Sequence, residues 1–473
     1  MSDAVVVGSG PNGLAAAVAL AQRGFGVTVL EAADEAGGGA RSAELTLPGL
    51  LHDQCSAVHP TGCGSPFFHS LGLERHGVAW SWPEVDLAHP LDSGSAGVLR
   101  RSLEDTARGL GVDGRAWRAV FGRPAAGFDA LAEDLFRPVA HLPKHPVQLA
   151  NFGMRALLPA TGLARAWRSD EARALFAGIA AHAFYPLNRP VSAAIGTMLT
   201  AAGHRYGWPV ARGGSQSIVD ALVALLAEHG GVVETGRPVH RYADLPPSDV
   251  LLLDLDPAAA VRILGPQLPA RVRRAYTRYR RGPGAYKVDL AVQGGIPWRN
   301  EDCRKAGTVH VGGTLEEVAR AERDVYRGTM PERPFVLVAQ QYLADPQRSS
   351  GDVHPVWTYA HVPHGYEGDA TEAVLRQIER FAPGVRERIL GTFVRSAPEM
   401  ARYNANYIGG DIATGANTPV QSVLRPRVAV DPYATGVPGV FLCSAATPPG
   451  PGVHGMCGYN AALSALRYHA RHA

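Results

Sequence analysis

The sequence predicts an α/β fold, in which helices cover a parallel sheet, joined to a second, discontinuous α+β domain. Two observations predict this class. The apolar segment 4–7 runs into a glycine-rich turn, a helix and a second strand, which is the βαβ order of a parallel sheet. Helices and buried strands alternate again over 213–264 and in the closing part of the chain. The remaining segments, helical over about 100–200, are left for the second domain.

Composition is that of an ordinary globular protein and excludes several classes of function. The 473 residues are 19% charged and 46% hydrophobic, and the net charge of +3 is too small to indicate a nucleic-acid partner. We expect no secretory signal, because the start lacks a basic and an apolar region. No stretch reaches the roughly 18 apolar residues of a membrane-spanning helix. Five cysteines, an odd number, predict reduced thiols and a cytoplasmic location.

The first glycine-rich turn has the spacing that binds a dinucleotide. Gly8 permits a tight turn, Gly10 lets the backbone approach a pyrophosphate, and Gly13 lets helix and strand pack closely. Pro11 lies at the start of the helix, whose free N–H groups face the phosphates. Glu31 ends the second strand, where it accepts hydrogen bonds from ribose hydroxyls. The complete unit predicts dinucleotide binding.

The residues after Glu31 favour a flavin dinucleotide. The run GGGARS resembles the glycine-glycine-arginine motif of the glutathione-reductase-type FAD proteins, which include amine oxidases and phytoene desaturases. Arg41 matches its second basic position, whereas Gly39 departs from the arginine that those families often carry. The resemblance implies that FAD is the cofactor and that Gly38 and Arg41 help to bind it. GLLHDQCSAVHP is similar to the flavin-proximal loop that desaturases build around an aspartate, here Asp53.

A second GxGxxG match, in TPPGPGVHGMCGYNAA, does not predict a second nucleotide site. Its strand does not lead directly into the first glycine, and three prolines fix φ and remove N–H donors. The segment resembles the carboxy-terminal flavin segment of the same families. That resemblance places Ser444, Gly455 and Met456 at the cofactor, with helix N–H groups facing the flavin N1–O2 edge. We therefore expect one FAD, held by both ends of the chain.

A third segment, GGSQSIVDALVALLAEHGGVV, reads as a helix with a Gly-Gly stop, followed by strands near Val232 and Val239. By itself this pattern predicts only a helix followed by a hairpin, which is not specific for cofactor binding. The resemblance implies the middle FAD segment, with the Val239 backbone against the adenine. The expected FAD-binding domain therefore comprises residues 1–90, 205–285 and 425–473, and the substrate domain comprises 91–204 and 286–424.

Together the motifs resemble the phytoene-dehydrogenase-like FAD oxidoreductases, in the group of the pyridine nucleotide-disulfide oxidoreductase domain-containing proteins. SPFFHSLGLERHG, WTYAHVPHG and NYIGGDIATG spread this similarity over nearly the whole chain. The resemblance implies a Rossmann-type domain like that of glutathione reductase and amine oxidases. It also implies oxidation of an apolar, isoprenoid or polyene, substrate by hydride transfer to the flavin. Because no second nucleotide domain is predicted, we expect oxygen or a quinone as the electron acceptor.

Two other functions stay open at this stage. One is an oxidase of an amine or another small polar molecule that produces hydrogen peroxide. The other is a flavin-binding protein whose main role is interaction with a partner, because fold alone does not determine function. Peripheral contact with a membrane and the oligomeric state are left open as well.

Four residues are candidates for chemistry at the flavin. His59, His361 and His454 each lie in a motif that carries the resemblance. WTYAHVP alternates as a strand, which places Tyr359 and His361 on one face, toward the substrate in this hypothesis. Lys287, one of only three lysines, is similar to the amine-oxidase lysine that holds a water at flavin N5. The paired aromatic cage of those enzymes is missing, so the alternative is a lysine at a strand edge that reaches solvent.

Two further patterns are interpreted as structural. His52, Cys55, His59 and Cys63 are zinc-ligand types, but their spacing matches neither the common finger nor the ribbon pattern. We interpret them as a packed loop near the cofactor and expect no metal. The run RVRRAYTRYRR at 271–281 is the only basic cluster, and we interpret it as a solvated helix face.

Overall fold

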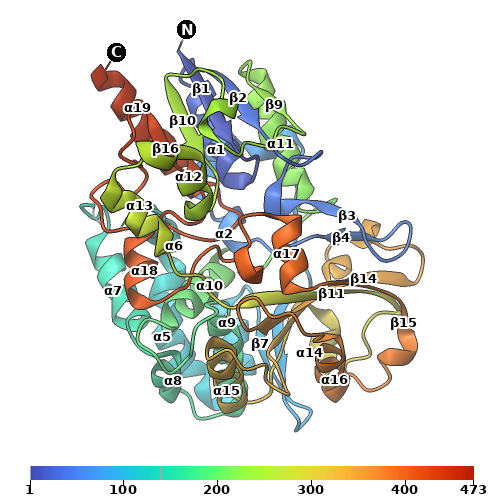
Figure 1. Cartoon of the computed structure of the whole chain (residues 1–473). Helices are drawn as coiled ribbons and strands as arrows, with labels where there is room; N and C mark the ends of the chain where they lie inside the picture. The colour runs from blue at the N-terminus through green and yellow to red at the C-terminus, as the bar shows by residue number, and fades with distance from the viewer. Residues whose placement is uncertain (1, 139–140, 473) are drawn as a thin grey trace.

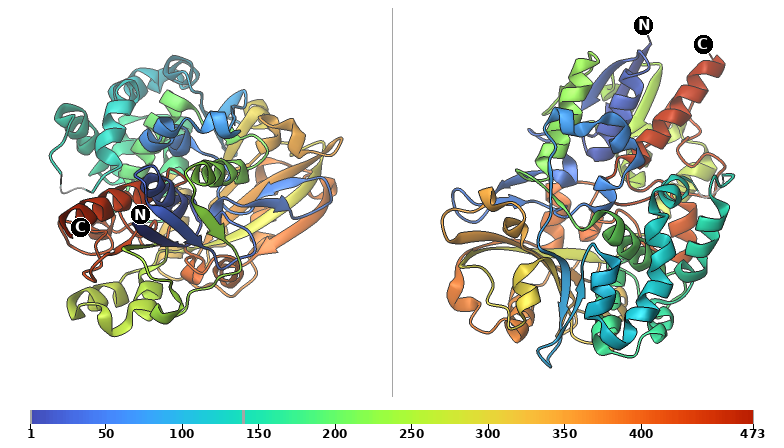
Figure 2. Two further views of the ribbon diagram at one scale, coloured as in Figure 1. Left: turned by 90° about the horizontal axis from the view of Figure 1, so that it is seen from above. Right: turned by 180° about the vertical axis from the view of Figure 1, so that it is seen from behind.

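The computed structural model describes every residue except 1, 139–140 and 473, and it contains two large sheets. Figure 1 shows the smaller, parallel sheet at the top, beside both termini, and the larger sheet below it. Figure 2, seen from behind, shows the helices of the second domain packed to one side of the larger sheet. The α/β class predicted from the sequence is confirmed.

The parallel sheet has five strands in the order β16-β10-β1-β2-β9. Its strands are short and apolar because helices cover both faces. Helices α1, α11 and α19 pack on the face that carries Val6 and Leu252, and α12 and α13 pack on the face that carries Val7 and Leu253. The elements are β1 (Asp3–Val7), α1 (Pro11–Ala21), β2 (Gly26–Leu30), α11 (Gln216–Glu228), β9 (Val232–Glu234), β10 (Val250–Leu253), α12 (Pro257–Leu264), α13 (Ala270–Thr277), β16 (Val440–Leu442) and α19 (Met456–His472).

Helix α1 packs against its surroundings backbone to backbone. A methyl group added at Gly13 would overlap the carbonyl oxygen of Gly8. On the other side of the helix, a methyl group at Gly458 of α19 would overlap the carbonyl oxygen of Asn12. The glycines therefore allow the turn, α1 and the closing helix to approach one another without intervening side chains.

The larger sheet has seven strands in the order β15-β11-β14-β13-β12-β6-β7, paired antiparallel except for β12 and β6. Alternate residues of β11 point to opposite faces, so Val288 and Leu290 pack with α14 and α16, whereas Ala285 belongs to the cluster of α5 and α9. The elements are α5 (Gly114–Ala126), α9 (Asp170–Ala181), β6 (Val85–Pro90), β7 (Ala96–Leu99), β11 (Gly284–Gln293), α14 (Glu301–Lys305), β12 (Ala306–Val311), β13 (Val336–Ala339), β14 (Val353–Val362), α16 (Thr371–Phe381) and β15 (Ile389–Arg395).

The structure differs from the sequence-based expectations at one domain boundary and at one predicted strand. Strand β6 lies inside the expected range 1–90, yet it pairs with β12 and β7 of the larger sheet. A domain boundary placed before β6 would agree with the pairing of this strand with β12 and β7. The strand expected near Val239 does not form, and that residue lies in an irregular segment after β9.

The remaining elements connect or flank the two sheets. They are β3 (Ser42–Glu44), β4 (Leu51–Asp53), α2 (Pro60–Cys63), α3 (Pro66–Leu71), β5 (Trp80–Ser81), α4 (Leu103–Gly109), α6 (Phe128–Leu135), α7 (Pro146–Ala156), α8 (Ala160–Leu163), α10 (Ala193–Tyr206), β8 (Val210–Ala211), α15 (Leu315–Tyr326), α17 (Ala397–Tyr403) and α18 (Pro419–Leu424). Among the described residues, no helix is both long and apolar enough to cross a bilayer.

The packing of α19 on α1 predicts a large effect of one methyl group. Gly458→Ala should lower the free energy of unfolding by about 1–3 kcal/mol, because neither backbone can move without disturbing the core. Gly153→Ala is the matched control, since its added methyl group has no neighbour within 4 Å and alanine favours a helix. Urea unfolding followed by circular dichroism measures both. Equal stability of the two variants would contradict the packing.

Candidate cofactor site and its surroundings

A cavity of about 420 Å³ lies at the carboxyl ends of the parallel strands β1, β2, β10 and β16. This is where open α/β sheets bind their ligands. Its walls come from the first glycine-rich turn, from the segments after β2 and β10, from 402–407 and from 444–453. The expected cofactor residues that line it are Gly8, Gly10, Pro11, Glu31, Gly38, Arg41, Val239 and Ser444. Gly13 lies beneath the turn, while Gly455 and Met456 lie outside the cavity lining.

Glu31 is held at the cavity edge by the turn itself. Its Oε2 accepts hydrogen bonds from the backbone N–H and the hydroxyl of Ser9, at 2.8 and 2.5 Å. Its Oε1 accepts one from the Ala33 N–H at 2.9 Å. The acid is thus fixed in position beside Gly8 and Gly10, as a ribose-binding carboxylate must be.

Asp254 is a cavity residue that sequence reasoning missed. Its Oδ2 accepts a hydrogen bond from the Gly13 N–H at 2.9 Å and lies 2.7 Å from where a β-carbon on Gly10 would be. Burial, together with repulsion from the Glu31 carboxylate, raises the pKa of Asp254 to about 7. Its position in the sequence could have indicated this role, because Asp254 directly follows the buried strand VLLL and the carboxyl ends of parallel strands bind ligands.

The segment after α17 closes the cavity from the side of the larger sheet. The Tyr407 hydroxyl occupies the space that a side chain on Gly39 would need, which explains why glycine stands at that position. Arg41 donates to the carbonyl oxygens of Gly38 and Tyr403, both at 3.0 Å, and lies over the Tyr403 ring. Sequence analysis identified this segment only through the family resemblance of NYIGGDIATG, because the contact between Tyr407 and Gly39 joins residues far apart in the chain.

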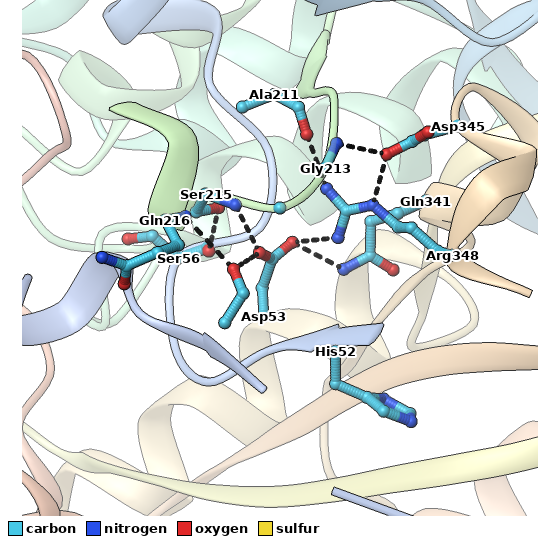
Figure 3. A network of polar contacts seen from close by, with 12 residues as sticks. His52, Asp53, Ser56, Ala211, Gly213, Ser215, Gln216, Gln341, Asp345 and Arg348 are labelled. Carbon is cyan, nitrogen blue, oxygen red and sulfur yellow. Dashed lines mark hydrogen bonds and ion pairs between the residues drawn. The ribbon is translucent and has the colours of Figure 1, made fainter. Parts of the chain in front are cut away.

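A buried network of charges joins the loop of Asp53 to the start of α11 and to the segment between β13 and β14 of the larger sheet (Figure 3). Asp53 accepts hydrogen bonds from Arg348 and from the Ser215 N–H, each at 2.7 Å. Arg348 also donates to Asp345 at 3.0 Å and to the Ala211 carbonyl at 2.7 Å. Burial alone would raise the pKa of Asp53, but the guanidinium and the hydrogen bonds from Ser215 and Ser42 hold it below its usual value. The network therefore contains a charged pair.

His59 and His454 are buried and neutral. Burial lowers the pKa of each to about 4. The Ser215 hydroxyl donates to the Ser56 carbonyl, so it accepts from His59 Nε2 at 2.8 Å. His454 Nδ1 accepts from the Met456 N–H at 3.1 Å, and its ring packs on Phe136. Both imidazoles thus brace loops around the site, and neither lines the cavity.

The zinc-ligand types of the same loop do not converge. His52 bonds Thr46, His59 bonds Ser215, and Cys55 packs with Met400 and Tyr407. Over the described part of the chain, no three His, Cys, Asp or Glu side chains form a group that could hold a metal ion. All five cysteines are free and buried.

Lys287 is not an edge lysine that reaches solvent, so that interpretation is wrong. It lies on β11, between β15 and β14, and is only 1% exposed. Its ammonium is paired with Asp289 and lies 5.5 Å from the centre of the Trp357 ring. Burial lowers its pKa against the opposing effect of Asp289. Lys287 lies outside the cavity lining, near the Cys55 thiol that packs on Tyr407.

His361 lies on the face of the larger sheet that carries Tyr359, as the alternation predicts. Its Nδ1 bonds the buried Glu322 carboxylate at 2.7 Å, and its ring stacks on Phe184 at 3.8 Å between centroids. Its Nε2 has no partner among the described residues. The structure thus groups His361 with aromatic side chains, away from the cofactor cavity.

Comparison with known proteins first defines the class of the amino-terminal domain. Residues 6–71 match the family model of the NAD(P)-binding Rossmann-like domain. The whole chain is 24% identical to the pyridine nucleotide-disulfide oxidoreductase domain-containing protein 2 of Mus musculus, over 98% of this chain and 93% of that protein.

Two solved structures share the fold over nearly all of both chains. A mutant of putrescine oxidase has a TM-score of 0.62 at 17% identity and covers 99% of each chain. A fatty acid isomerase from P. acnes that produces CLA has a TM-score of 0.57 at 18% identity and covers 98% of this chain and 97% of the isomerase. The protein therefore has the mixed α/β fold of FAD-dependent amine oxidases and related oxidoreductases.

The raised pKa of Asp254 predicts a pH dependence of stability. The folded protein keeps this proton at pH values at which the unfolded chain, with a carboxyl pKa near 4, has released it. The stabilisation is therefore complete below about pH 4 and is lost as pH rises through about 7. Asp254→Asn should remove this slope, a gain on the order of 4 kcal/mol at pH 8 at most.

Urea unfolding of the cofactor-free protein from pH 4 to pH 8 measures this dependence. Asp352→Asn is the control, because that side chain is 74% exposed. A wild-type slope that persists in Asp254→Asn would show that another group titrates.

Proposed function

We propose that the protein is an FAD-dependent oxidoreductase that dehydrogenates an apolar substrate. The observation that carries the proposal is the cavity at the carboxyl ends of the parallel strands, which both ends of the chain help to line. Its glycine-rich turn has room for backbone–phosphate contact, because Gly10, which caps α1, has no side chain. Of the N–H groups in the first turn of α1, that of Gly13 is already bonded to Asp254. Bound FAD would supply a hydride acceptor.

The residues present fit a dinucleotide. Gly8, Gly10 and Pro11 would hold the pyrophosphate, Glu31 the ribose and Val239 the adenine. A protonated Asp254 would avoid repelling the phosphates, and its raised pKa favours that form. In the same proposal Gly13 supports the turn. The flavin end would be bound by Gly38, Arg41, Ser444, Gly455 and Met456.

An apolar substrate is favoured by the aromatic face of the larger sheet. Trp357, Tyr359 and Phe184 lie on that face beside His361. An imidazole nitrogen without a hydrogen-bond partner, such as His361 Nε2 among the described residues, can accept the proton that substrate carbon loses as hydride departs. We therefore keep His361 as a candidate base, with Lys287, His59 and His454 as further candidates. We propose oxygen or a quinone as the electron acceptor.

A second candidate is an amine oxidase that releases hydrogen peroxide. The observation that favours it is the fold shared with putrescine oxidase, together with the buried Lys287 on β11. Anaerobic titration separates the two functions. Loss of flavin absorbance with an isoprenoid or a long-chain lipid supports dehydrogenation of an apolar substrate. Loss with amines alone, followed by peroxide formation in air, supports the oxidase instead.

The position of Glu31 predicts its contribution to cofactor affinity. Glu31→Gln should weaken FAD binding by about 10–100-fold, because a charge-assisted hydrogen bond contributes about 1.5–3 kcal/mol. Glu35→Gln is the control, since Glu35 is exposed four residues further on and is absent from the cavity lining. Quenching of FAD fluorescence gives both dissociation constants. Equal constants in the two variants would exclude a ribose contact of Glu31.

A further inference from the structure

Helix α7 has an apolar side that no described part of the chain covers. Val147, Met154 and Leu157 lie on one face at helical spacing and are 76%, 65% and 65% exposed. The opposite face buries Phe152 and Ala156 against the second domain. Exposed aliphatic side chains that gather on one helix face indicate an interaction surface, and α7 has such a face beside its buried one.

Helix α18 and the segment after it continue this surface. Val420, Val423 and Leu424 are exposed on one side of α18, and Val430 is 90% exposed. One groove of about 650 Å³ is lined by Arg137, Pro138, His141 and Lys144 and by the segment 430–433, so the chain before α7 meets the chain after α18. Figure 1 shows α7 and α18 on the same side of the molecule. We call this surface the apolar face: Leu142, Val147, Met154, Leu157, Val420, Val423, Leu424, Val428 and Val430.

Positive charge surrounds the apolar face. No acidic residue lies between Asp134 and Asp170, or between Asp411 and Asp431, and these two stretches contain the whole face. The lining of the groove contains four basic residues and two acidic ones: Arg137, Lys144, Arg467, Arg471, Glu133 and Asp431. Glu133 is paired with Lys144, so the lining keeps an excess of positive charge. Negative charge would therefore be attracted to the groove.

The arginine run 271–281 adds to this charge. The backbone of Arg280 bonds the Gln421 side chain of α18 at 3.1 and 2.8 Å, so the run adjoins the apolar face. Its outward arginines are exposed and have no ion pair within the described ranges: Arg271, Arg273, Arg274, Arg278 and Arg280. A solvated helix face was the expected interpretation, and its exposure agrees with that. The run also lies beside the exposed aliphatic side chains of α18, so it adds positive charge next to the apolar face.

We propose that the apolar face and its arginines dock on the surface of an anionic lipid bilayer. Aliphatic side chains would enter the region between headgroups and acyl chains, and the arginines would bind lipid phosphates. A second copy of the chain is a poorer partner. A two-fold interface brings the same patch of both copies together, which would oppose one set of arginines to the other. Only Glu133, already paired with Lys144, and Asp431 could offset this repulsion among the groove residues. The proposal does not depend on the substrate or on the flavin.

Sedimentation with vesicles tests the proposal. The wild-type protein should bind vesicles of phosphatidylcholine mixed with phosphatidylglycerol, bind phosphatidylcholine alone weakly, and be released by salt. Met154→Asp combined with Leu157→Asp should lower the affinity at least about tenfold. Arg273→Glu combined with Arg274→Glu should remove the preference for phosphatidylglycerol. Leu390→Asp is the matched control, because Leu390 is a 50% exposed aliphatic on β15 at the other side of the molecule.

Three results would overturn the proposal. The wild-type protein would stay in the supernatant with anionic vesicles, or the double aspartate variant would bind them as well as the wild type. Alternatively, sedimentation velocity would show a dimer that the same variant dissociates, with no vesicle binding, which would assign the face to a second copy. Thermal unfolding of each variant, compared with Leu390→Asp, establishes that the fold is intact.

Discussion

The absence of side chains where α1 meets its neighbours is the constraint on which the rest of the structure depends. Gly13 brings the helix onto the turn of Gly8, and Gly458 brings the closing helix onto Asn12. Because the first and last helices touch through their backbones, the two ends of the chain meet at the carboxyl ends of the parallel strands. The cavity exists only because segments hundreds of residues apart are held at that edge.

The buried network around Asp53 links this edge to the larger sheet. Arg348 follows β13, Ser215 precedes α11, and Asp53 ends β4, so three distant segments share one set of charge-assisted hydrogen bonds. Removing one partner of a buried pair leaves the other charge without compensation, which costs about 3–5 kcal/mol. The network therefore makes the position of the Asp53 loop sensitive to the larger sheet, where Lys287 and His361 lie.

Local patterns carried the prediction of the parallel sheet and of most cavity residues. The unit from Asp3 to Glu31 is continuous in sequence, and its glycines have steric roles that can be read without a structure. Asp254 and Tyr407 were missed because each acts through a contact with a distant glycine. The alternative interpretation of Lys287 as a solvent-exposed lysine at a strand edge was wrong. The strand order places β11 between β15 and β14, and this order follows only from tertiary pairing. The expected boundary at residue 90 falls after β6, whereas the pairing of β6 with β12 and β7 places that strand in the larger sheet.

Residues from both ends of the chain line one cavity, to which the proposed function assigns a single dinucleotide. The most direct measurement is the number of FAD molecules bound per chain at saturation, from the absorbance of released flavin and the protein concentration. We expect one FAD per chain, with no further equivalent taken up at the second glycine-rich segment. Two equivalents, or saturation by a nicotinamide dinucleotide in place of FAD, would contradict it.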